Sequence, residues 1–236
     1  MIRGYWGTIT VTIFLLFLSG CSSINLEERL APILKPLTKE KTVSNQRSVE
    51  NKNALAVSRE SNPEKLRYSH LLDKGYQALE SDEIGYYMDI QEARLRQEFA
   101  HKDILIKRDQ DVIKLVIPGT SMFAKNSTDL NPEVKNSLNS IAYVLAEYNK
   151  TFVAVEGYAD NSGVAEYNQR LSEQRALSAG NYLANKGVEV ERLIIIGYGD
   201  KHPLANNTSE QGRAQNRRIE LKLYPLTSLD YSQAQR

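Results

Sequence analysis

The sequence predicts a mixed α/β (α+β) fold, a two-layer sandwich in which helices cover a sheet. Short apolar runs alternate with segments in which apolar side chains recur every three or four residues. Capping residues and glycines bound the helical segments. Because each element has an apolar face to bury, this alternation builds one sheet with helices packed against it.

The N-terminus is predicted to be an export signal. Arg3 precedes an apolar run at 9–18, which is too short for a mature membrane span and typical of a signal peptide over 1–20. Leu18-Ser19-Gly20-Cys21 resembles a bacterial lipobox, so we expect Cys21 to carry acyl chains such as palmitate. The alternative is an unmodified cysteine after an ordinary signal peptide. Ser22 rather than Asp follows the cysteine, and by resemblance to the lipoprotein sorting pattern this favours the outer membrane.

Residues 21–63 are predicted to form a flexible tether, because their polar composition cannot bury enough surface to offset ordering entropy. A coil of this length spans about 35 Å. Residues 64–101 then show helical periodicity, and Ser81-Asp82-Glu83 indicates a break and a new N-cap between helices at about 64–80 and 83–100. Their Tyr and Leu stripe is either a packing face or a surface for a protein partner or self-association.

The domain is expected to begin with a hairpin. Apolar runs at 104–107 and 112–117 flank a polar turn. A loop over 121–130 contains Phe123, and Asn131-Pro132 opens a helix that ends near Asn149.

The second half of the domain alternates strands and helices. We expect a strand over 151–158, a helix over 164–186 that stops at Gly187, and a buried strand over 193–197. A short helix over 209–215 and a half-buried strand over 217–224 complete the domain, and 226–236 is expected to be a polar tail.

An acid and a base are predicted to share a small space around the 164–186 helix. Asn168, Leu171, Ser172 and Arg175 fall on one helical face, and Asp160 lies in the loop that feeds it. Arg175 can hold a carboxylate with two hydrogen bonds while Asp160 accepts from an ammonium, so the pair suits a zwitterion. The alternative is a plain Asp–Arg salt bridge or a capping pair.

Several motifs occur in the order of a known family, and they resemble the OmpA-like peptidoglycan-binding domain. They are G-Y-A-D-N-S-G at 157–163, Y-N-Q-R-L-S-E-Q-R-A at 167–176, R-L-I-I-I-G-Y-G at 192–199 and G-R-A-Q-N-R-R-I-E at 212–220. The resemblance implies a βαβαβ domain over 102–225 that binds the diaminopimelate of the peptidoglycan stem peptide.

The resemblance also implies the roles of individual residues. Asp160 and Arg175 would hold the zwitterionic end of diaminopimelate, and Asn168, Arg217, Leu171 and Phe123 would line the pocket. Without the resemblance, Arg217 would be read as part of a solvated strand end. Two departures are visible, because the family often has G-H-T-D where this chain has Gly157-Tyr158-Ala159-Asp160, and often has Asp where it has Ala124.

Other classes of function find little support. Basic and acidic residues balance at 30 and 29, which argues against nucleic acid binding, and the single cysteine excludes an intrachain disulfide. We expect no cofactor, no metal site and no catalytic residue, because the three histidines are scattered and no G-x-S-x-G motif occurs. The favoured function is a non-enzymatic anchor between outer membrane and peptidoglycan. The alternatives are a wall-remodelling enzyme and an interaction subunit of an envelope complex, whose motor-stator version is weaker.

Overall fold

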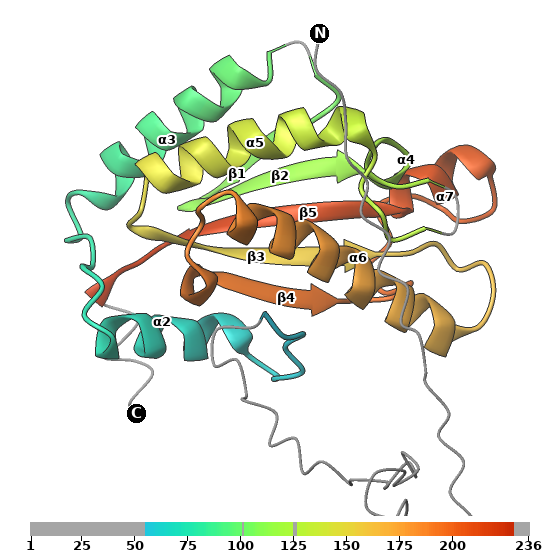
Figure 1. The fold of residues 1–236 in the computed structure, drawn as a ribbon, viewed down its shortest axis with the longest axis horizontal. Coiled ribbons are helices and arrows are strands. Elements are labelled where there is room, and N and C mark those ends of the chain that lie inside the picture. Colours follow the sequence, from blue (N-terminus) through green and yellow to red (C-terminus); the bar gives the residue numbers. More distant parts are fainter. Residues whose placement is uncertain (1–54, 101, 125–126, 229–236) are drawn as a thin grey trace, which may run out of the picture. The chain divides into compact units, whose positions relative to one another are not determined.

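A five-stranded sheet frames the domain, with the strand order β1-β2-β5-β3-β4 (Figure 1). The computed structural model describes residues 55–100, 102–124 and 127–228. The strands are β1 (Leu105–Asp109), β2 (Val112–Pro118), β3 (Thr151–Tyr158), β4 (Leu193–Gly197) and β5 (Arg218–Pro225). β3 and β4 are parallel, whereas β1–β2, β2–β5 and β3–β5 are antiparallel. The predicted mixed α/β class is confirmed, and β3 and β4 have the predicted bounds.

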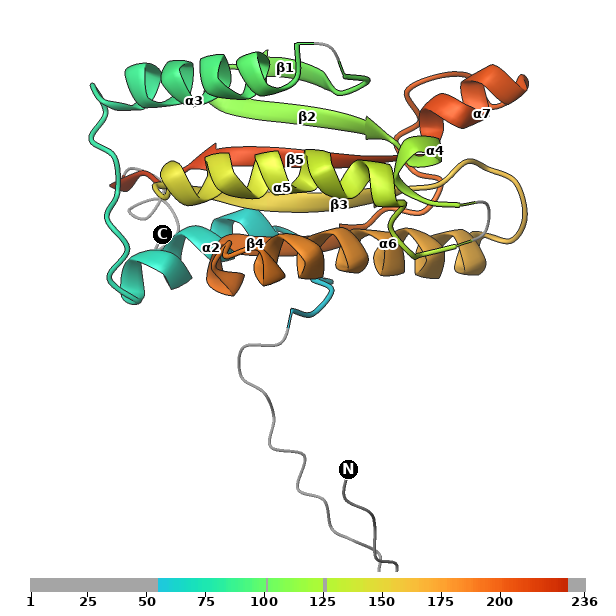
Figure 2. The same ribbon diagram turned by 45° about the horizontal axis from the view of Figure 1, so that its top comes forward.

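Helices pack on both faces of the sheet. They are α2 (Pro63–Asp73), α3 (Ile84–Glu98), α4 (Gly119–Met122), α5 (Pro132–Glu147), α6 (Ala165–Asn185), the 3-10 helix η1 (Val190–Arg192) and α7 (Glu210–Asn216). α3, α5 and α6 lie in front of the sheet in Figures 1 and 2 and bury the main core with β2, β3 and β5. Gly187, at φ +96°, follows the last turn of α6 as predicted.

A second apolar cluster lies on the other face of the sheet. Tyr68 and Leu71 of α2 pack against Phe152 and Ala154 of β3 and against Ile194 of β4. β3 is therefore buried along its whole length, on both faces. The prediction of two layers holds for most of the sheet, but α2 adds a partial third layer. The stripe on the predicted helical segment is thus largely a packing face, although Leu66, Tyr86 and Ile90 stay exposed.

The first predicted helix is shorter than expected. We expected it to reach residue 80, but α2 ends at Asp73, and Gly75 follows at φ +87°. Leu79 instead donates its backbone N–H to the carbonyl of Leu226 at 2.7 Å. The N-cap of α3 is Glu83, within the predicted Ser81-Asp82-Glu83 break, and its side chain accepts from the backbone N–H of Glu80.

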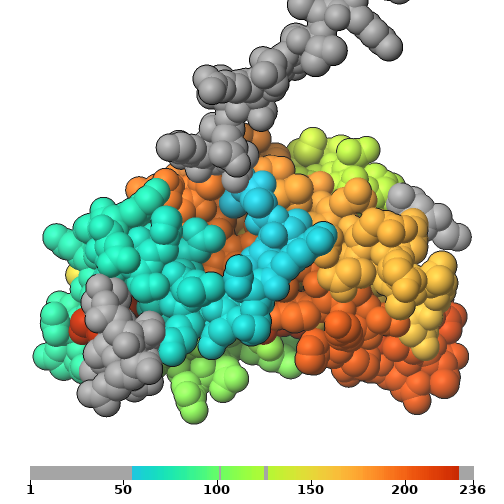
Figure 3. Space-filling view, turned by 90° about the horizontal axis from the view of Figure 1, so that it is seen from below, coloured from blue at the N-terminus to red at the C-terminus, as the bar shows by residue number. Residues whose placement is uncertain are grey.

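Residues at both ends of the described unit, predicted to lie outside the domain, pack against it. Residues 55–60 were predicted to belong to the tether, but Val57 forms a parallel bridge with Ile195 of the edge strand β4. Figure 3 shows the cyan segment that leads into α2 lying on the surface of this unit. Leu226, predicted to begin a polar tail, is buried. Residues 21–54 of the predicted tether, including Cys21, and the predicted signal peptide lie outside the described residues.

Two further elements also differ from expectation. The predicted 121–130 loop overlaps the short helix α4. β5 is more buried than expected. It lies between β2 and β3, and Glu220, on the face where solvent was expected, is buried and pairs with Arg218 at 2.7 Å. Lys222 and Tyr224 stay partly exposed. Charged residues that alternate with apolar ones along a strand predict a solvent-exposed face, but here Arg218 and Glu220 form a buried ion pair.

Gly157 allows β3 to lie close to α6 just before the strand delivers Asp160. A Cβ at this position would lie 2.1 Å from the carbonyl oxygen of Ser172, so helix and strand would have to separate. We expect Gly157→Ala to lower the free energy of unfolding by about 1–3 kcal/mol, the range for overpacking. Gly85→Ala in α3 is the control, since its Cβ meets nothing within 4 Å. Denaturant unfolding of both variants checks this, and equal stabilities would contradict it.

Candidate functional site

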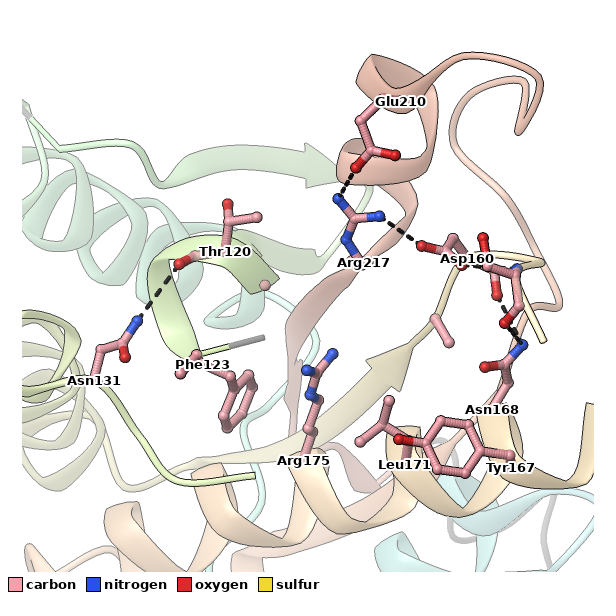
Figure 4. Close-up of a pocket in the computed structure, with 14 residues that line it drawn as sticks. Thr120, Phe123, Asn131, Asp160, Tyr167, Asn168, Leu171, Arg175, Glu210 and Arg217 are labelled. Atoms are coloured by element: carbon pink, nitrogen blue, oxygen red, sulfur yellow. Dashed lines mark hydrogen bonds and ion pairs between the residues drawn. The ribbon is translucent and has the colours of Figure 1, made fainter. Parts of the chain in front are cut away.

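A pocket of about 660 Å³ opens where β3 ends, between α4, α6 and α7. All six residues predicted to bind the ligand line it, although they come from separate elements (Figure 4). They are Phe123, Asp160, Asn168, Leu171, Arg175 and Arg217. The structure therefore brings the predicted set together in one space.

Asp160 is held by the loop that follows β3. Its carboxylate accepts a hydrogen bond from the backbone N–H of Ser162 at 2.8 Å and from the guanidinium of Arg217 at 2.6 Å. Burial raises the pKa of Asp160, but these hydrogen bonds outweigh burial and hold the pKa below its ordinary value. Asp160 is consequently a carboxylate at neutral pH and an acceptor for a cation.

Asn168 holds the backbone of this loop through two hydrogen bonds. Its Nδ2 donates to the carbonyl of Asp160 at 3.0 Å and to that of Ser162 at 3.1 Å. Asn168 is nearly fully buried on the first turns of α6. It fixes the direction in which the Asp160 side chain leaves the backbone.

Arg175 supplies the second charge of the predicted pair, but it does not pair with Asp160. Its Nε donates to the carbonyl of Ser127 at 3.0 Å, and its guanidinium lies 5.1 Å from the ring centroid of Phe123. Within the described ranges, Arg175 forms no ion pair with a carboxylate. Burial lowers the pKa of Arg175, yet an arginine stays protonated at neutral pH. The simple Asp160–Arg175 salt bridge is therefore not what the structure shows.

Arg217, and not Arg175, forms the ion pair with Asp160. It lies between α7 and β5, with one guanidinium nitrogen on Asp160 and the other on Glu210, each at 2.6 Å (Figure 4). Its neighbours in the basic cluster point elsewhere. Asn216 binds the backbone of Leu204 and Ala205, and Arg218 lies over the ring of Tyr158.

The two departures from the family motif fall at and near the pocket. Ala159 and Ala124 line it without a polar group. Tyr158 turns away, because its hydroxyl donates to Glu156 and its ring stacks on Tyr198. The polar contacts of this pocket therefore come from Asp160, Arg175 and their neighbours.

Sequence reasoning missed Glu210, Tyr167 and Thr120, which also line the pocket. Glu210 lies in the first turn of the short helix α7, where an acidic residue is common and does not by itself indicate a site. One signal could have found it, because Glu210 and Arg217 are seven residues apart and so fall on the same side of a helix that ends between them.

Part of the chain is similar to known proteins. The family model described as OmpA family matches residues 122–217. The "Probable lipoprotein YiaD" of Escherichia coli is 43% identical over 143 residues, which are 61% of this chain and 65% of that protein. The "Peptidoglycan-associated lipoprotein" of Pseudomonas putida is 40% identical over 103 residues, which are 44% of this chain and 61% of that protein. The chain thus spans slightly less than two thirds of either relative.

A solved structure shares the fold. A MotB-like protein from Desulfovibrio vulgaris superposes with a TM-score of 0.54 and 25% identity, covering 60% of this chain and 94% of that one. Within the part of the chain that the structure describes, no helix is both long and apolar enough to cross a membrane.

Proposed function

We propose, from the premise that residues 122–217 form an OmpA family domain, that this domain binds peptidoglycan without acting on it chemically. The similarity to a protein named as a peptidoglycan-associated lipoprotein supports the class of ligand. The lowered pKa of Asp160 supports a binding role, because a general acid needs a raised pKa.

Within peptidoglycan, we propose the diaminopimelate of the stem peptide as the group that enters the pocket. The far end of this residue carries an ammonium and a carboxylate on one carbon. The observation that carries the proposal is the presence of Arg175 in the same pocket as Asp160, with no carboxylate of its own among the described residues. A ligand carboxylate can take the open guanidinium, while the ligand ammonium approaches Asp160.

The apolar walls fit the rest of the ligand. Phe123 lies against the Arg175 guanidinium, and Leu171 faces the pocket one turn earlier on α6. A hydrocarbon chain between the two charged ends of diaminopimelate can rest on these side chains. Excluding water there strengthens the charged contacts.

We further propose that Cys21 is the lipid attachment site and that it holds the chain in the outer membrane, with the domain in the periplasm. The lipobox-like Leu18-Ser19-Gly20-Cys21 supports this, and acylation at more than one position gives stable anchoring. Many weak pockets held in one membrane then bind the wall strongly through effective concentration.

Binding of defined peptides tests the ligand. A tripeptide ending in meso-diaminopimelate is expected to bind roughly 10- to 100-fold more tightly than one ending in lysine, which lacks the carboxylate for Arg175, since a charge-assisted hydrogen bond contributes about 1.5–3 kcal/mol. The affinity for the diaminopimelate peptide should be the same at pH 5 and pH 7, because the pKa of Asp160, which would accept from the ligand ammonium, lies below its ordinary value. Calorimetric titration measures both. Equal affinity for the two peptides would rule out diaminopimelate as the recognised group.

A further inference from the structure

Glu210 stands at the rim of the pocket and contacts its charges through Arg217. The Arg217 guanidinium donates to Asp160 Oδ2 and to Glu210 Oε1 at the same distance, 2.6 Å. The Asp160 side chain is 10% exposed, whereas that of Glu210 is 67% exposed. Arg217 is therefore shared between an inner carboxylate and an outer one.

This sharing balances the charges of the pocket. Its lining holds two carboxylates, Asp160 and Glu210, and two guanidiniums, Arg175 and Arg217. A balanced set suits a ligand with one charge of each sign. Without Glu210 the lining would carry a net positive charge, which favours an anion.

Sharing also leaves Asp160 open to a second partner. An ammonium that approaches Asp160 competes with Arg217 for the same carboxylate. Glu210 already accepts a hydrogen bond from the other guanidinium nitrogen of Arg217. Arg217 therefore keeps an anionic partner if a ligand ammonium weakens its contact with Asp160. If Glu210 were neutral, Asp160 would be the only carboxylate for Arg217 in the pocket lining, and the ammonium would have to displace it.

We propose that Glu210 is a positioning residue that makes this pocket prefer a zwitterion over an anion, by holding Arg217 between two carboxylates. The inference rests on the proposed function, and it adds a residue that neither the sequence motifs nor the predicted site contained. Glu210 acts on the ligand through Arg217 and Asp160.

Glu210→Gln tests the proposal with two ligands. The first is the tripeptide ending in meso-diaminopimelate, and the second is the same tripeptide acetylated on its far amino group, which keeps the carboxylate but loses the ammonium. With the full chain, we expect Glu210→Gln to weaken the first about five-fold, the size of an exposed charge pair, and not to weaken the second, because a more positive lining does not oppose a carboxylate. The ratio of the two affinities therefore falls about five-fold or more, and high salt should shrink this change.

Arg213→Gln is the matched control. Arg213 contacts the other oxygen of Glu210 at 2.8 Å and does not line the pocket, so its loss should leave the ratio unchanged. An equal loss of affinity for both peptides in Glu210→Gln would show a merely structural role and overturn the inference alone. A wild-type chain that binds neither peptide would overturn the proposed function and the inference with it.

Discussion

Arg175→Ala is expected to lower the affinity for diaminopimelate peptide by about 10- to 100-fold, which would abolish recovery of the protein with sedimented peptidoglycan. Arg175 is the pocket cation that has no carboxylate partner within the described ranges, so nothing else can replace its contact with a ligand carboxylate. The range follows from the contribution of about 1.5–3 kcal/mol per charge-assisted hydrogen bond. Arg175→Lys should recover only part of the binding, because an ammonium cannot offer two parallel donors.

Arg170→Ala is the matched control for this variant. Arg170 is an exposed arginine on the same helix, it lines a neighbouring groove, and it does not reach the pocket. Its removal changes net charge equally and should leave binding intact. Thermal unfolding must accompany the assay, since Arg175 also donates to Ser127.

Asp160→Ala should lose binding to a similar extent. This variant removes the acceptor for the ligand ammonium and leaves Arg217 paired with Glu210 alone. If Asp160→Ala and Arg175→Ala both sediment with peptidoglycan as the wild type does, the ligand binds elsewhere and the assignment of this pocket is wrong.

Local signals predicted most of the fold. The bounds of β3 and β4 were predicted to the residue, because their apolar runs end at a turn and at a glycine. The end of α6 was predicted from Gly187, which follows the helix at positive φ. The packing of α2 on the second face could not be predicted, because a helical stripe does not say which surface covers it. The end of α2 at Asp73 was missed because the apolar spacing runs on through Leu79, whose partner, Leu226, is distant in sequence.

The residues that line the site could be predicted from the sequence, but the ion pairs and hydrogen bonds among them could not. The resemblance assigned Asp160, Arg175 and Arg217 to one pocket, and the structure brings them together. Which guanidinium reaches Asp160 depends on side-chain directions across three elements, and spacing along α6 carries no such information. Glu210 was missed for the same reason, since its role exists only through Arg217.

Arg192→Met is expected to destabilise the domain by about 3–5 kcal/mol. Arg192 is 1% exposed, and its guanidinium donates to three backbone carbonyls, those of Leu145 at 2.7 Å, Tyr148 at 2.9 Å and Thr151 at 2.6 Å. The first two belong to the C-terminal end of α5, where carbonyls have no partner within the helix and a cation is favoured by the helix dipole. Methionine fills similar space but leaves these buried acceptors unsatisfied, and each costs about 1–3 kcal/mol.

Denaturant unfolding measures the effect, with Arg59→Met as the control. Arg59 is exposed and makes one ion pair at 3.4 Å, so its loss should cost less than about 0.5 kcal/mol. A loss below about 1 kcal/mol in Arg192→Met would mean that water replaces the guanidinium. The Arg192 side chain, from η1, contacts the first residue of β3, whereas the pocket lies at the other end of this strand. The fraction of Arg192→Met that remains folded should therefore bind diaminopimelate peptide with wild-type affinity, which separates what stabilises this domain from what recognises its ligand.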